Sequence, residues 1–213
     1  MTSVEYVSHM GDDLTVVNAA RVSMAKHKEV FDHKDEKLIR YLVKHEHWTP
    51  LSHPQITLRE TVPIFVARQR FKHMVGFTYN EVSRRYVDSD PEFHYPSEWR
   101  SRPEGSIKQG SGSPIQHSLH ASDKYAIFIE KAKQLYHDLL EMGAAPEQAR
   151  MVLPQSMLTS YYVTGSLAAF ARAFRQRIDA HAQAEIQEMA KQWDAIISSL
   201  YPVSWAALTK GKY

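Results

Sequence analysis

The chain has 213 residues, of which 43% are hydrophobic and 23% charged, and its formal net charge at pH 7 is +2. This composition is that of an ordinary globular protein with one sizeable core, and so small a net charge gives no argument for a nucleic-acid partner. The absence of cysteine excludes disulfides, thiolate metal sites and every mechanism that needs a cysteine nucleophile.

The first predicted elements are two helices and a strand. Residues 12–23 and 35–46 each begin with acidic residues, which stabilise the N-terminus of a helix. Residues 55–62 alternate apolar and polar side chains, as a half-buried strand does. Only Glu60 breaks this alternation.

The next predicted element is a helix over residues 63–74. Pro63 suits its first position, where a missing backbone N–H costs nothing. Gln69, Lys72 and His73 are spaced at i, i+3 and i+4, so a continuous helix would place them on one face. Such a face can line a site or simply face solvent, and the second is the commoner fate of Lys and Gln.

A strand is predicted over residues 79–87, with a continuation through 91–96. Alternate side chains of a strand share a face, so Glu81, Ser83 and Arg85 would form one polar row. A carboxylate, a hydroxyl and a guanidinium together suit a polar ligand that carries an anionic group. A ladder of salt bridges on a solvated face explains the same pattern about equally well.

Residues 101–121 are rich in Gly, Ser and Pro, a composition that fits a domain linker and a surface loop or lid equally well. We favour the loop, because candidate site residues lie on both sides of it. A helix over 122–143 follows, with Ser122 as its cap and Gly143 as its end. Its predicted apolar stripe consists of Tyr125, Phe128, Ala132, Leu135 and Leu139.

The remaining elements are a short helix over 146–150, a strand over 157–165 and helices from Ser166 onward. The last helical stripe comprises Ile186, Met189, Trp193, Ile196 and Leu200. Strands and helices do not alternate in a βαβ rhythm, so we predict an α+β fold. We expect a mixed or antiparallel sheet flanked by helices, long C-terminal helices and a single domain over residues 1–213.

Three histidines, His45, His47 and His53, raise the question of a metal site. On a helix, His-x-His places the two rings on different faces, and no acidic residue stands at metal-site spacing, so we predict no metal. Arg177 and His181 would share a face if the helix were continuous, and that spacing alone favours a structural role. No apolar run approaches the roughly 18 residues of a membrane span, and residues 1–13 lack the pattern of a secretory signal. We therefore expect a cytoplasmic protein.

The segment PIFVARQRFKHMVGFTYNEVSRRYV, residues 63–87, resembles the signature region of the flavin-dependent thymidylate synthases. The family pattern is Arg-Gln-x-x-Arg-His-Arg, a short bend, and Ser-x-Asn-Glu-x-Ser-x-Arg-Tyr. The resemblance extends, in the family's order, to residues 19–23, 44–53, 149–154 and 177–187. It covers nearly the whole chain apart from the loop 101–121. It also fits the missing cysteine, because this family works without an enzyme nucleophile.

The resemblance implies reductive methylation of dUMP to dTMP. Methylenetetrahydrofolate would supply the carbon, and NADPH would reduce a bound FAD. The family works as a homotetramer whose sites are shared between subunits, with no nucleic-acid partner. Two other functions stay open: a flavoprotein of this fold with an altered substrate, and a binder of single-stranded nucleic acid that uses the basic and aromatic segment 68–86.

The resemblance also assigns residues to the two ligands. The positions that match dUMP contacts are Gln69, Lys72, Glu81, Ser83, Arg84, Arg85, Arg150 and Arg177. The positions that match FAD contacts are Ser23, Thr49, Lys72, His73, Met74, Glu81, Ser166, Arg172 and His181. Arg177 matches the catalytic arginine that favours the ionised uracil. The chain departs from the family at Lys72-His73-Met74, which replaces Arg-His-Arg, and at Ser166 and Ala168, which replace an asparagine and an arginine.

Overall fold

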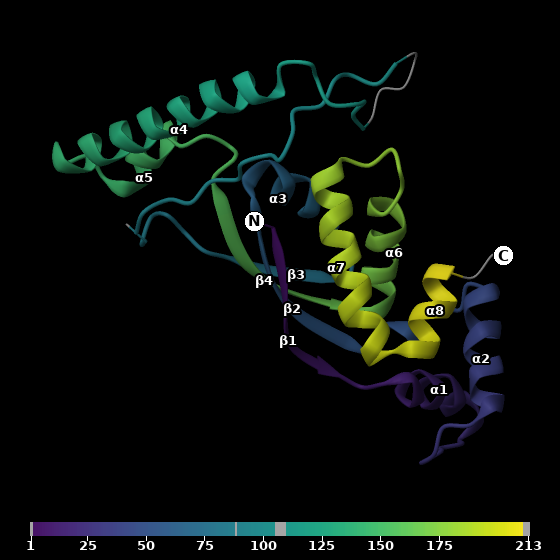
Figure 1. Ribbon diagram of the computed structural model, residues 1–213. Helices are drawn as coiled ribbons and strands as arrows, with labels where there is room; N and C mark the ends of the chain where they lie inside the picture. Colours follow the sequence, from purple (N-terminus) through teal and green to yellow (C-terminus); the bar gives the residue numbers. More distant parts are fainter. Residues whose placement is uncertain (1, 88, 105–109, 211–213) are drawn as a thin grey trace.

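The computed structural model describes residues 2–87, 89–104 and 110–210. A four-stranded antiparallel sheet of order β1-β2-β4-β3 lies at its centre, and the C-terminal helices pack beside it (Figure 1). This architecture confirms the predicted α+β class. Part of the predicted loop, residues 105–109, lies outside the described residues.

The two central strands are both predicted, the first from the alternation over residues 55–62 and the second over 157–165. β2 (Gln55–Pro63) and β4 (Leu158–Ser166) pair along their whole length, from Gln55 opposite Ser166 to Pro63 opposite Leu158. The core-facing side of β2 carries Ile56, Leu58 and Val62, all fully buried. Glu60 points to the same side and is also fully buried, so the residue that breaks the pattern is a charge inside the core.

The edge strands are less visible in the sequence. β1 (Ser3–Met10) has no counterpart in the sequence prediction, because most of its side chains are exposed and no alternating burial marks it. β3 spans only Phe77–Glu81 and pairs with β4. The predicted strand over 79–87 is therefore wrong beyond Glu81. The predicted continuation over 91–96 is also wrong, since only Phe93 makes an isolated bridge there, to Met157.

The N-terminal helices are confirmed. α1 (Asp13–Arg21) is capped by Asp12, whose carboxylate accepts a hydrogen bond from Thr15 N in a capping box. α2 (His33–Lys44) has the same kind of cap, made by Asp32. Each cap stabilises its helix by about 1 kcal/mol. Two short 3₁₀ turns, η1 (Val22–Met24) and η2 (Pro50–Ser52), follow the two helices.

The helix after Pro63 is shorter than predicted. α3 (Ile64–Arg70) ends four residues before Met74, and Pro63 is its N-cap. The chain then turns at Gly76, whose φ of +81° favours glycine. A side chain at Gly76 would lie 2.9 Å from Ala169 Cβ, so the close approach of the bend to the helix that follows β4 also requires glycine.

The long helix α4 (Ser118–Glu141) begins one turn before the predicted start. Ser122 is not its cap, because its hydroxyl accepts a hydrogen bond from Trp99 Nε1 instead. Gly143 ends the helix as predicted, with a φ of +90°. The buried residues of α4 are Ile129, Ala132 and Tyr136; Ala132 belongs to the predicted stripe, whereas Ile129 and Tyr136 do not.

Two members of the predicted stripe are exposed, Phe128 by 52% and Leu135 by 45%. The helix α4 and the short helix α5 (Pro146–Ala149) lie away from the C-terminal helices, so the chain itself leaves this apolar side uncovered (Figure 1). A 3₁₀ turn, η3 (Arg150–Val152), connects α5 to β4.

Three helices complete the chain: α6 (Leu167–Arg177), α7 (Ala184–Leu200) and α8 (Pro202–Lys210). The large core lies between them, the sheet and α1 and α2. Ile186, Met189 and Trp193 are fully buried as predicted, whereas the predicted Ile196 and Leu200 are only partly buried. Within the described ranges, no helix has the length and apolarity needed to cross a bilayer.

Candidate functional site

A cavity of about 670 Å³ lies where β3 ends, next to η3 and the start of β4. Five of the eight residues that the resemblance assigns to dUMP line this cavity: Glu81, Ser83, Arg84, Arg85 and Arg150. They come from two segments about 65 positions apart in the sequence, and the fold brings them together because β3 pairs with β4. The cavity therefore concentrates three guanidinium groups around one concave surface.

The backbone explains how these side chains reach the cavity. The last ladder contact is Val82 N to Ser160 O at 2.9 Å, and the chain then turns, with Tyr86 N donating to Ser83 O at 3.0 Å. Glu81, Ser83 and Arg85 therefore do not form the predicted row on one strand face. They approach each other because the chain turns around the cavity.

The contacts within this turn leave specific groups available to a ligand. The Ser83 oxygen accepts from Arg85 N at 3.3 Å and from Arg85 Nε at 3.5 Å, so the hydroxyl hydrogen can donate elsewhere. Glu81 Oε1 accepts from Thr159 Oγ1 at 2.6 Å. Arg84 donates to the carbonyl oxygens of Ser89 and Asp90. An anion bound here would meet charged N–H donors and the Ser83 hydroxyl, an arrangement that suits phosphate.

A second group of predicted residues lies around the bend between α3 and β3. Arg177, the last residue of α6, donates from Nε to His73 Nε2 at 2.8 Å and from Nη2 to Gln69 O at 3.4 Å. Arg172, earlier in the same helix, donates to Val75 O. Two arginines of α6 thus hold the bend from one side.

The electrostatics of this group keep His73 neutral. Burial and the neighbouring charges of Arg177, Arg70 and Arg172 lower the pKa of His73 to about 4. A guanidinium can only donate, so His73 Nε2 must accept and the ring hydrogen stands on Nδ1. His73 therefore offers one N–H donor to a ligand over the whole physiological range.

The remaining residues assigned near FAD lie at or close to this bend or at the ends of neighbouring elements. Lys72 and Met74 are exposed in the bend, Met74 by 73%. His181 lies beyond the end of α6 and contacts Asp179 at 2.9 Å, so the predicted helical face with Arg177 is wrong. The predicted shared face of Gln69, Lys72 and His73 is wrong for the same reason, since α3 ends at Arg70.

Three assigned residues lie at the ends of elements. Ser166 is the N-cap of α6, where its hydroxyl accepts from Ala169 N at 3.2 Å. Thr49 is exposed just before η2, and Ser23 is exposed within η1, where it donates to Ala20 O at 3.1 Å.

The sequence prediction missed a buried ion pair beneath the bend. Arg70 and Glu60 are both fully buried, and Arg70 Nε lies 3.0 Å from Glu60 Oε2. Trp193 Nε1 donates to the other carboxylate oxygen at 2.8 Å. The signal that could have found the pair was Glu60 itself, because a charge on the apolar side of a strand needs a partner.

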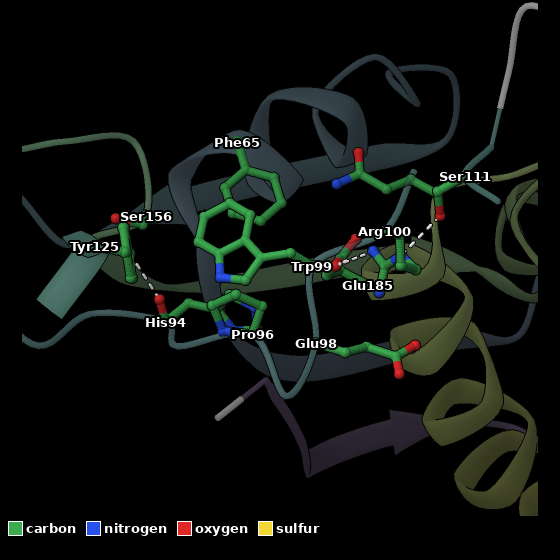
Figure 2. Close-up of a pocket in the computed structure, with 11 residues that line it drawn as sticks. Phe65, His94, Pro96, Glu98, Trp99, Arg100, Ser111, Tyr125, Ser156 and Glu185 are labelled. Atoms are coloured by element: carbon green, nitrogen blue, oxygen red, sulfur yellow. Dashed lines mark hydrogen bonds and ion pairs between the residues drawn. The ribbon is translucent and has the colours of Figure 1, made fainter. Parts of the chain in front are cut away.

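The prediction also missed a smaller cavity of about 280 Å³, shown in Figure 2. Its walls include Phe65, Trp99 and Tyr125, and one end is closed by an ion pair between Arg100 and Glu185. Arg100 Nε also donates to Ser111 Oγ at 2.7 Å, so these contacts fasten the segment before and after residues 105–109 to α7. None of the assigned residues lines this cavity.

Comparisons with known proteins agree with the resemblance. Residues 5–203 match the family model described as thymidylate synthase complementing protein. A flavin-dependent thymidylate synthase of Thermosipho africanus is 39% identical over 208 residues, which cover 97% of this chain and 90% of that protein. The enzyme of the same name from Thermus thermophilus is 33% identical, over 96% of this chain and 74% of its own length.

The fold comparison finds a nucleotide methylase. The crystal structure of the UMP/dUMP methylase PolB from Streptomyces cacaoi, bound with 5-Br dUMP, superposes with a TM-score of 0.87 at 30% identity. The superposition covers 97% of this chain and 94% of that one. The matched region takes in both groups of site residues, the core sheet and the C-terminal helices. The chain therefore belongs to the flavin-dependent thymidylate synthase family.

Proposed function

We propose that this protein methylates dUMP to dTMP, with methylenetetrahydrofolate as carbon donor and NADPH as reductant of a bound FAD. The observation that carries the proposal is the gathering of Glu81, Ser83, Arg84, Arg85 and Arg150 around one cavity. The activity itself comes from the relatives, which are flavin-dependent thymidylate synthases and a UMP/dUMP methylase.

The cavity suits a nucleoside monophosphate in size and in charge. Its volume of about 670 Å³ falls within the range of about 300–1,000 Å³ that is usual for small-molecule sites. Arg85 and Arg150 are exposed at its rim, where they can pair with a phosphate dianion, and Ser83 adds a hydroxyl donor. Glu81 supplies the acceptor that a ribose hydroxyl needs.

The other three assigned dUMP residues support a site shared between chains. Gln69, Lys72 and Arg177 do not line the cavity. These three residues lie around the bend before β3, whereas the cavity lies at the other end of β3. The five residues of β3 place the bend and the cavity about 13 Å apart. A nucleotide in the cavity of one chain would therefore meet the bend of another chain. We propose a homotetramer, and the exposed apolar side of α4 is the surface on which we expect chains to associate.

The bend and its surroundings fit the cofactor. Lys72 and Arg172 place cationic groups near His73, as a ligand with a pyrophosphate requires. His181 lies beyond the end of α6. His73 is neutral and can donate from Nδ1. The N-terminus of α6 lies next to the bend, since Ser166 N donates to Gly76 O at 3.2 Å. When bound, the flavin supplies the hydride that the uracil ring receives.

The residues of the chain then contribute binding, orientation and charge. Arg177 stabilises negative charge on the uracil ring, which favours its ionised form. His73 holds Arg177 at 2.8 Å, so the guanidinium is already oriented before the nucleotide binds. No side chain acts as a nucleophile in this proposal. We also propose a cytoplasmic location and no role for nucleic acid.

The test is the purified protein incubated with FAD, NADPH, methylenetetrahydrofolate and dUMP, followed by product analysis. We expect a bound flavin spectrum that changes on addition of dUMP, and formation of dTMP. Parallel incubation with UMP would show whether a ribonucleotide is also accepted. A protein that binds flavin but makes no methylated nucleotide would contradict the proposal and favour an altered substrate.

A further inference from the structure

The ion pair beneath the bend is unusual because it is isolated from water. The guanidinium of Arg70 lies over the rings of Phe77 at 4.4 Å and Trp193 at 4.7 Å, and Glu60 accepts from both Arg70 and Trp193. Replacing a buried ion pair by apolar residues of similar volume is often neutral or stabilising. Stability alone therefore gives a weak reason for this pair.

A hydrogen-bonded chain connects the pair to the site. Arg70 Nη1 donates to the Tyr79 hydroxyl at 2.6 Å, and the same hydroxyl lies 2.6 Å from His73 O. The guanidinium can only donate, so the hydroxyl accepts from Arg70 and gives its own hydrogen to the carbonyl. Burial raises the pKa of Tyr79 to about 12, so the hydroxyl stays protonated. The direction of every hydrogen bond from Glu60 to His73 is thus fixed.

The bend needs such a support. Its residues lie between the end of α3 and the start of β3, outside regular secondary structure. Its own backbone contacts are single turns, among them His73 N to Arg70 O at 3.1 Å and Phe77 N to Met74 O at 3.1 Å. On one side the bend is held by Arg172 and Arg177 of α6, and on the other by Tyr79.

We propose that Glu60, Arg70 and Tyr79 are positioning residues, which orient His73 and, through it, Arg177 for ligand binding. The identity of the ligands rests on the proposed function, but the orientation of His73 does not. Glu60 and Trp193 fix the guanidinium of Arg70, Arg70 fixes the Tyr79 hydroxyl, and Tyr79 fixes the backbone of His73. The buried pair serves the geometry of the site rather than the stability of the core.

The first test is Tyr79→Phe, which removes only the hydroxyl. Tyr136→Phe is the matched control, because the Tyr136 hydroxyl is also buried and has no hydrogen-bond partner among the described residues. We expect Tyr79→Phe to weaken FAD binding at least tenfold, measured by flavin fluorescence, and to lower kcat with a smaller change in KM for NADPH. Tyr136→Phe should leave both unchanged.

A second readout uses the protein without flavin. The charges that lower the pKa of His73 are those of Arg172 and Arg177 of α6 and Arg70 of α3, and Lys72 is its neighbour in the bend. In an NMR titration, with the signal assigned by its loss in His73→Gln, the wild-type ring should stay neutral down to about pH 4. In Tyr79→Phe the ring should become more exposed, and its pKa should move up toward the ordinary value.

A double variant, Glu60→Gln with Arg70→Met, removes both charges together and leaves no unpaired ion in the core. We expect it to reproduce the Tyr79→Phe effects, and adding Tyr79→Phe to it should cause no further loss, because all three residues act through one chain of contacts.

The proposal is overturned if Tyr79→Phe keeps the wild-type FAD affinity and the wild-type titration of His73. This criterion depends on the single variant alone, so it holds even if the double variant does not fold. A wild-type protein that fails to bind FAD would refute the proposed function, and the titration would still decide the positioning role.

Discussion

Ser83 is one of the hydroxyl residues that line the nucleotide cavity, and its surroundings predict that it is not a nucleophile. Attack on uracil would require a base to remove its proton. Its oxygen accepts twice from Arg85, which is no base, and the nearby carboxylate of Glu81 is engaged by Thr159 at 2.6 Å. We therefore expect Ser83→Ala to weaken dUMP binding and still to form dTMP at saturating nucleotide.

The magnitude follows from the contacts. The variant loses one hydrogen bond to a charged phosphate, which is worth about 1.5–3 kcal/mol. Since about 1.4 kcal/mol corresponds to a factor of ten, the dissociation constant for dUMP should rise about 10- to 150-fold. Ser199→Ala is the control, because this exposed serine of α7 donates to the nearby Ile196 O and lies outside the cavity. It should leave dUMP affinity unchanged.

The assay is a single turnover of the reduced flavoenzyme with excess dUMP and methylenetetrahydrofolate, followed by quantification of dTMP. Circular dichroism shows whether the variant is folded, and the titration of the flavin spectrum shows whether dUMP saturates it. A folded and saturated Ser83→Ala protein that forms no dTMP would show that the hydroxyl takes part in the chemistry.

Three further predictions concern the bend and the exposed helix. Arg177→Ala should lower turnover about 10²- to 10³-fold, as loss of one charge-stabilising donor usually does. The control is Arg175→Ala, at an exposed arginine two residues earlier, which should keep its turnover; equal turnover of both variants would remove Arg177 from the catalytic role. The pKa of His73 is about 4 in the folded chain and ordinary in the unfolded chain, so the unfolded chain binds more protons between about pH 4 and 6.5, and the free energy of unfolding should rise with pH in that range. In denaturant unfolding, His73→Gln should show a shallower rise, and an unchanged slope would contradict the neutral state of the ring. Phe128→Asp combined with Leu135→Asp should dissociate the tetramer in light scattering, because both side chains are about half exposed on the uncovered side of α4; a variant that remains tetrameric would place the interface elsewhere.

The sequence alone determined the elements whose signals are local. The acidic N-terminus at Asp12, the alternation along residues 55–62 and the glycine at 143 each depend on neighbours within a few positions, and each is confirmed. The second helix is also confirmed, but it begins at His33 with Asp32 as its cap, before the predicted start at residue 35. The family was also accessible, because the order and spacing of its motifs are properties of the sequence.

The ends of elements at the site depended on contacts between distant segments. Nothing local ends β3 at Glu81, and the strand stops where its pairing with β4 stops. The same holds for α3, which ends at Arg70 because the bend must pass close to α6 at Gly76. The prediction assumed that regular structure continued, and so it placed Ser83 on a strand.

Only the tertiary structure could show what the charge at Glu60 does. From the sequence it is a break in an alternating pattern, and its partner Arg70 is ten positions away on another element. The link onward to Tyr79 and His73 runs between side chains and backbone groups whose positions follow from the packing of the sheet against the helices. A buried charge must find its partner in three dimensions, and sequence spacing does not encode which partner that is.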